Sequence, residues 1–159
     1  MEQPQLSEFV DYREYLKAFY DYRQEQTKLR LRPYAYSDFS AAANIKSPNY
    51  LKLIIEGKRN LSREMCLKFS RALKHNRTQI KEFDLLVSYC QEKDPMQRNR
   101  NLKDLSEFRA KKAIESGAIN VETWDQVSSW LVWVLRATRK TAQSSPIWPG
   151  PSLKKTQDD

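Results

Sequence analysis

The stretch KSPNYLKLIIEGKRNLSREM, residues 46–65, decides the fold. Ser47 is a good N-cap and Pro48 suits the first position of a helix, so a helix is predicted from Ser47 to Glu56. Gly57 predicts the end of that helix, because glycine adopts the left-handed conformation of a C-cap without steric cost. The next three residues, KRN, then form a basic turn.

The predicted helix has one apolar face and one mixed face. Leu51, Ile54 and Ile55 share a face at helical spacing, which is typical of a helix packed on a core. The opposite face carries one apolar and three polar or charged side chains: Asn49, Lys52, Leu53 and Glu56. This second face is therefore the candidate for binding.

Capping residues on both sides of this stretch predict further helices. Asp11 with Glu14 three residues later is typical of a capping box. Asn76 with Gln79 repeats that pattern, and Ser62 is another good N-cap. An apolar stripe follows the first of these caps, made of Tyr12, Leu16, Phe19 and Tyr20. The fold class is therefore predicted to be all-α.

Composition is typical of one globular domain with an appendage. The 159 residues are 40% hydrophobic and 11% aromatic, which argues against global disorder. No run reaches the roughly 18 apolar residues of a membrane span, and an acidic N-terminus does not suit a signal peptide. The cysteines, Cys66 and Cys90, match no metal-binding spacing. They are predicted to be buried thiols in a reducing cytoplasm.

The basic charge is concentrated in one part of the chain. The net charge is +8, and residues 46–77 alone hold nine Lys and Arg against two Glu. Such a cluster favours nucleic acid as the partner, with an anionic membrane surface second.

Features of an enzyme are sparse. The single histidine, His75, follows a predicted helix and is expected to be solvated or capping. The three glycines are too scattered for a phosphate-binding loop, and carboxylates lie beside basic residues as on an ordinary solvated face. No catalytic residue, metal site or cofactor is predicted.

The segment YSDFSAAANIKSPNYLKLIIEGKRNLSREMCLKFSRALK, residues 36–74, resembles a helix-turn-helix of the Cro/C1-repressor type. The pair would consist of a first helix over 36–43 and a recognition helix over 47–56. With FVDYREYLKAFY at 9–20 included, residues 9–90 also resemble uncharacterised bacterial regulators that carry this module ahead of a helical C-terminal region. The turn ANIKSPN departs from the pattern, because it lacks the usual glycine.

The resemblance implies binding of double-stranded DNA, with the recognition helix in the major groove. The expected base contacts are Asn49, Lys52 and Leu53, the last through a thymine methyl group. The expected contacts to the DNA backbone are Lys46, Ser47, Tyr50, Lys58, Arg59, Asn60, Arg71 and Lys74. An exposed leucine at a base-reading position also suits a protein-interaction adaptor, which stays open as the alternative.

Residues beyond 90 fall into three predicted segments. Residues 91–119 are expected to be a charged, partly helical linker, and residues 144–159 a flexible tail. Residues 120–143 predict a tryptophan-rich amphipathic helix that packs back on the domain, forms a homodimer interface or binds a protein partner. Binding to a membrane surface is the weaker alternative, since its cationic residues cluster at one end. The interface residues would be Trp124, Val127, Trp130, Leu131 and Val134. The sequence as a whole predicts a dimeric transcriptional regulator with its helix-turn-helix domain in residues 1–90.

Overall fold

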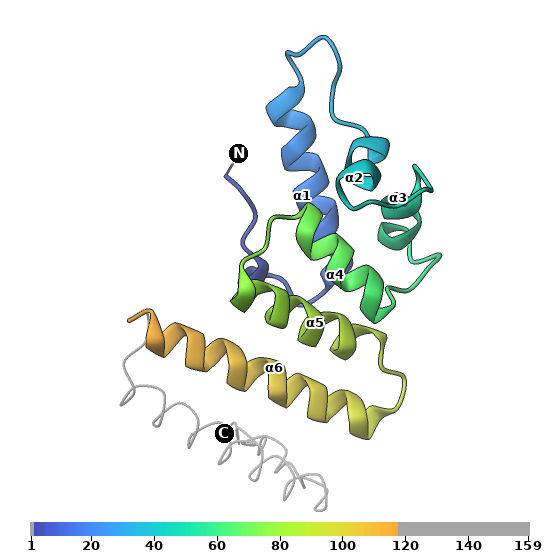
Figure 1. Ribbon diagram of the computed structural model, residues 1–159. Coiled ribbons are helices and arrows are strands. Elements are labelled where there is room, and N and C mark those ends of the chain that lie inside the picture. Colours follow the sequence, from blue (N-terminus) through green and yellow to red (C-terminus); the bar gives the residue numbers. More distant parts are fainter. Residues whose placement is uncertain (1, 118–159) are drawn as a thin grey trace, which may run out of the picture. The chain divides into compact units, whose positions relative to one another are not determined.

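The computed structural model describes residues 2–117, and the secondary structure in that range is entirely helical, as predicted (Figure 1). A 3₁₀ turn at Leu6–Glu8 precedes the α-helices α1 (Tyr12–Thr27), α2 (Tyr36–Ala42), α3 (Tyr50–Ile55), α4 (Arg63–Ala72), α5 (Arg77–Gln91) and α6 (Pro95–Glu115). Residues up to Ala113 form one compact unit. No helix within this range is long and apolar enough to cross a membrane.

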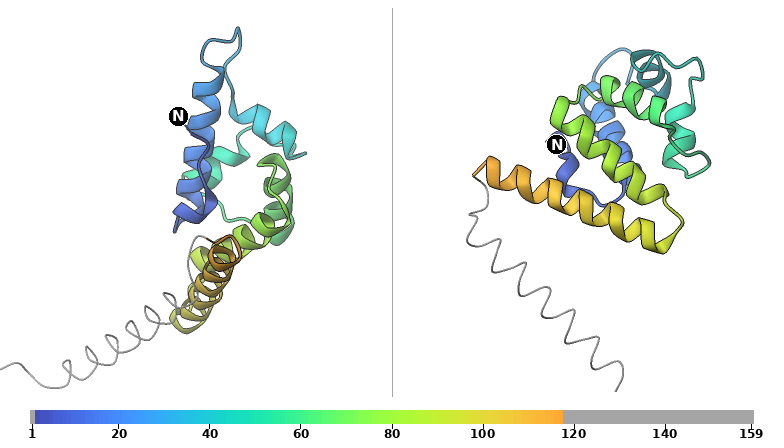
Figure 2. Two further views of the ribbon diagram at one scale, coloured as in Figure 1. Left: turned by 90° about the vertical axis from the view of Figure 1, so that its left-hand side faces the viewer. Right: turned by 60° about the horizontal axis from the view of Figure 1, so that its bottom comes forward.

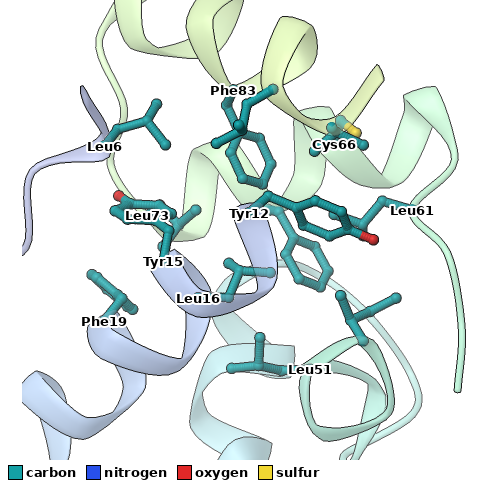
Figure 3. Packing of buried hydrophobic residues seen from close by; sticks show 14 of the residues in the cluster. Leu6, Tyr12, Tyr15, Leu16, Phe19, Leu51, Leu61, Cys66, Leu73 and Phe83 are labelled. Carbon is teal, nitrogen blue, oxygen red and sulfur yellow. The ribbon is translucent and has the colours of Figure 1, made fainter. Parts of the chain in front are cut away.

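Helix α1 lies at the centre of the core. Asp11 caps it by accepting a hydrogen bond from Arg13 N (2.8 Å), one residue earlier than a capping box predicts. The predicted apolar stripe is buried, and Tyr15 adds to it (Figure 3). The fully buried Leu51 of α3 belongs to the same cluster. Helix α3 is thus held against the body of the domain by its apolar face.

Helices α2 and α3 form an adjacent pair, which the views in Figures 1 and 2 show beside α1 and α4. Phe39 anchors α2, with its ring edge-on to Phe69 at 4.9 Å and to Phe19 at 6.4 Å. All three rings are buried, so α2 is fixed between α1 and α4. The position of α3 then follows from α2.

Three helices end in the same way, each with a residue in the left-handed region. Asn44 follows α2 with φ 52°, Gly57 follows α3 with φ 72°, and Lys74 follows α4 with φ 58°. In each case that residue's N–H and the next one both donate back into the last turn, as in a Schellman motif. The predicted C-cap at Gly57 is confirmed. Asn44 occupies the place of the glycine missing from the turn, since asparagine tolerates this conformation.

Helix α3 begins at Tyr50, so the prediction of a helix from Ser47 with an N-cap there was wrong. Tyr50 N donates to Ser47 O (3.3 Å), which makes a turn of the residues between them. The Ser40 hydroxyl of α2 donates to Pro48 O (3.1 Å), and Ser40 is 2% exposed. This bond holds Pro48 in the turn. Seven residues (43–49) connect the two helices.

The segment predicted as a charged linker contains α6, whose residues to Ala113 share the compact unit of α1–α5. Leu105 of α6 is buried, and Glu82 of α5 has no exposed surface. Arg109 Nε and Lys112 Nζ each lie 2.9 Å from a Glu82 carboxylate oxygen. Arg109 also donates to the carbonyl oxygens of Leu6 and Phe9. One arginine thus ties α6 to α5 and to the N-terminal segment.

The remaining local predictions concern helix caps and the burial of His75 and the two cysteines. The Asn76–Gln79 capping box and the Ser62 cap are confirmed. His75 is half-buried rather than fully solvated: its Nε2 lies 2.8 Å from the Tyr15 hydroxyl, and burial lowers its pKa to about 4. Cys66 is buried as expected, but Cys90 is only half-buried.

The predicted tryptophan-rich helix over 120–143 and tail over 144–159 lie outside the described residues, as do all five residues of the predicted dimer interface.

Candidate nucleic-acid interface

The candidate interface is formed by the outer face of α3 and the two turns that flank it. Leu51 and Ile54 are fully buried, so α3 turns its other face outward. Of the predicted contact residues in this region, those exposed are Lys46, Ser47, Asn49, Lys52, Lys58, Arg59 and Asn60; Tyr50 and Leu53 are half-buried. All nine of these residues lie in α3 or in the turns on either side of it.

The turn after α3 has a fixed geometry. Gly57 N donates to Ile54 O (3.0 Å), and the N–H groups of Lys58 and Arg59 both donate to Leu53 O (2.9 and 3.2 Å). A Cβ atom at Gly57 would meet nothing within 4 Å, so only the backbone conformation requires glycine there. The two basic residues are consequently presented from a rigid helix end.

Glu56 lies between two of the cations of this surface. Its carboxylate is 2.7 Å from Lys58 Nζ and 3.8 Å from Lys52 Nζ. The hydrogen bond from Lys58 is the main reason why the pKa of Glu56 lies below its usual value. Because these pairs are open to water, they are weak and can exchange for contacts to phosphate.

Arg59 lies beside the first residue of α3. Its guanidinium group is 5.9 Å from the centre of the Tyr50 ring, and that ring meets Phe69 edge-on at 6.0 Å. An arginine held against an aromatic ring keeps its donors free for an anion. Four exposed cations lie in α3 and its flanking turns, against one carboxylate, that of Glu56. They are Lys46, Lys52, Lys58 and Arg59.

Arg13 is a positioning residue that sequence reasoning missed. From the start of α1 its Nε donates to Ile54 O (3.2 Å), and its Nη2 donates to Asn60 Oδ1 (2.8 Å). The side chain joins the last turn of α3 to the basic turn. Asn60, predicted to contact DNA, therefore holds its oxygen toward Arg13 and keeps its amide N–H groups for another partner.

The other two predicted backbone contacts, Arg71 and Lys74, come from the C-terminal end of α4 and not from α3 or its flanking turns. Arg71 lies in the last turn of α4, and Lys74 follows the end of that helix. Lys74 lines a separate cavity together with Arg23 and Arg32. The predicted backbone contacts thus come from two segments of the chain, residues 46–60 and 71–74.

Comparisons with protein-family models, curated proteins and solved structures found no match to this chain.

Proposed function

We propose that this protein is a DNA-binding transcriptional regulator, acting in the cytoplasm as a binding protein rather than an enzyme. The observation that carries the proposal is the surface around α3, where a helix paired with α2 presents exposed polar and cationic side chains on both sides of its single carboxylate. Duplex DNA fits such a surface, because a helix can enter its major groove while the flanking cations bind its phosphates.

In this proposal the surface has two functional parts. Asn49 and Lys52 reach base edges in the major groove, where an amide suits adenine and an ammonium group suits guanine. Lys58 and Arg59, fixed by the turn at Gly57, hold phosphates on the adjacent backbone. The amide nitrogen of Asn60, oriented by Arg13, reaches the same strand.

Helix α3 has only six residues, so it reads a short sequence by itself. A two-fold dimer places two such helices about one turn of DNA apart and doubles the site. We propose that the tryptophan-rich segment 120–143 supplies the dimer contact, because it is the most apolar stretch of the sequence after residue 117.

A protein-interaction adaptor is the second candidate. Leu53 is half-exposed in the middle of the same surface, where a base-reading protein usually has a polar side chain. An adaptor would bury Leu53 against a partner protein and would not require Asn49.

The test is binding to a pool of random duplexes over a series of salt concentrations. Phosphate contacts release counterions, so the logarithm of the association constant must fall linearly with that of the salt concentration. A regulator enriches particular sequences from the pool. An adaptor enriches none, and its apolar association responds weakly to salt.

A further inference from the structure

A cavity of about 670 Å³ lies away from the α3 surface, between the C-terminal half of α1, the loop that follows it, and the ends of α2 and α4. Its volume is within the range of sites for small molecules. Cationic and aromatic side chains line it, among them Phe19, Tyr22, Arg23, Tyr34 and Lys74.

The charge of this cavity is strongly positive. Arg23, Arg30, Arg32 and Lys74 line it, and its one carboxylate belongs to Asp38. Arg32 Nη2 lies 3.1 Å from Asp38 Oδ1 and is thereby neutralised. Within residues 2–117, the other three cations form no ion pair. Such a concentration of like charge favours an anion in the space between them.

Arg23 has an unused hydrogen-bond donor. Its guanidinium group lies 5.0 Å from the centre of the Tyr34 ring, and its Nε is buried without a hydrogen-bond partner. Buried N–H groups are nearly always paired, since an unpaired one loses the hydrogen bonds that water would give it. Because this Nε has almost no accessible surface, an anion in the cavity would meet the other guanidinium nitrogens of Arg23.

The walls of the cavity are already in position. Thr27, 7% exposed, accepts a hydrogen bond from Tyr34 N at 2.8 Å and so closes the loop onto α1. After the end of α4, Lys74 adopts φ 58°, a conformation that glycine would adopt with less strain. The Lys74 side chain lines the same cavity as Arg23 and adds a second cation to it.

We propose that this cavity binds a small phosphate ester with a planar organic group. The phosphate would be held by Arg23 and Lys74, because guanidinium and ammonium groups are the usual phosphate partners. The organic group would lie against Phe19 and Tyr22, since the cavity is far larger than a phosphate ion. The site is separate from the α3 surface and goes beyond the proposed DNA binding.

The test is calorimetric titration of the full chain with phenyl phosphate, using inorganic phosphate and phenol as partial probes. Phenyl phosphate is expected to bind more tightly than either probe. Arg23→Gln and Lys74→Gln are each expected to weaken it roughly ten- to a hundredfold, the value of a charged hydrogen bond. The control is Lys17→Gln, which removes one exposed charge from α1 outside the cavity and leaves binding unchanged.

Two results would overturn the proposal. One is the absence of saturable heat with phenyl phosphate up to about 10 mM, a concentration that detects even weak sites. The other is an equal affinity of Arg23→Gln, Lys74→Gln and Lys17→Gln for phenyl phosphate. Since Lys74 is exposed, its glutamine variant keeps the test valid if Arg23→Gln does not fold.

A phosphate of DNA has the same chemistry, so a second arm separates the two sources. Arg23→Gln and phenyl phosphate are both expected to leave the affinity for duplex unchanged. If Arg23→Gln weakens duplex binding and phenyl phosphate competes with duplex, the cavity holds a DNA phosphate and the small-molecule proposal is wrong. Loss of duplex binding in Lys58→Ala concerns only the α3 surface, so the failure of one proposal is distinct from that of the other.

Discussion

Lys58 Nζ lies 2.7 Å from a Glu56 carboxylate oxygen, across the turn that Gly57 makes at the end of α3. The same carboxylate is 3.8 Å from Lys52 Nζ. In the free protein, one acidic residue therefore engages two of the four cations proposed to meet DNA. A phosphate that approaches this surface competes with Glu56 for both lysines.

Glu56→Gln is predicted to increase the affinity for duplex DNA at low salt roughly threefold to tenfold, because it frees both lysines and removes a repulsive charge. Fluorescence anisotropy of a labelled duplex measures the change. The matched control is Glu64→Gln, which breaks the pair with Lys68 on α4 (2.9 Å) and changes the net charge equally. Equal effects of the two variants would mean that only overall charge matters.

Arg13→Lys is predicted to reduce the free energy of unfolding by about 1–3 kcal/mol, although it keeps the charge. The guanidinium fork spans Ile54 O and Asn60 Oδ1, and a lysine cannot satisfy both acceptors in the same geometry. Urea unfolding followed by circular dichroism measures the loss. Lys17→Arg, at an exposed position of the same helix, is the control and is expected to be neutral. An unchanged midpoint for Arg13→Lys would show that this link contributes nothing.

Lys74→Gly is predicted to stabilise the protein by roughly 1 kcal/mol, because φ 58° strains lysine and not glycine. The same substitution is predicted to weaken phenyl phosphate binding, so stability and binding change in opposite directions. Thermal unfolding and calorimetry measure the two effects. Lys74→Ala controls for loss of the side chain alone; if it were as stable as Lys74→Gly, backbone strain would not be the cause.

Stability is predicted to fall on acidification because of His75. Burial beside Tyr15 and Phe83 lowers its pKa from 6.5 to about 4, against the opposing influence of Glu82. Between these pH values the unfolded chain binds the proton and the folded chain does not, so its contribution is complete above pH 6.5 and is lost as the pH falls toward 4. The loss is roughly 1–2 kcal/mol, allowing for partial exposure of the ring. Urea unfolding at pH 7 and pH 5 measures it. A His75→Gln variant with the same pH slope as the parent would rule His75 out.

Local signals in the sequence predicted the features that short segments determine by themselves. The C-cap at Gly57 and the box of Asn76 with Gln79 are correct, because each depends on residues within one helix end. The caps at Asn44 and Lys74 were missed, since neither residue type marks a left-handed position as glycine does.

Contacts between distant segments were beyond the sequence pattern. Arg13 and Asn60 are 47 residues apart, and Arg109 meets Glu82 across 27. The start of α3 was misplaced for the same reason, because the Ser40 bond to Pro48 arises only when α2 is packed. The sequence thus predicted the exposed residues of the candidate surface. It did not predict Arg13, which holds Asn60 and the last turn of α3 in place.

The central claim is that the α3 surface reads DNA with Asn49 and holds it with Lys58 and Arg59. Anisotropy titrations of a selected and a random duplex, at several salt concentrations, test it most directly. Asn49→Ala is predicted to cost about 1–3 kcal/mol on the selected duplex and little on the random one. Lys58→Ala and Arg59→Ala are predicted to weaken both duplexes alike and to reduce the salt slope by about one unit each. If the parent chain binds neither duplex even at low salt, the account of the α3 surface is contradicted.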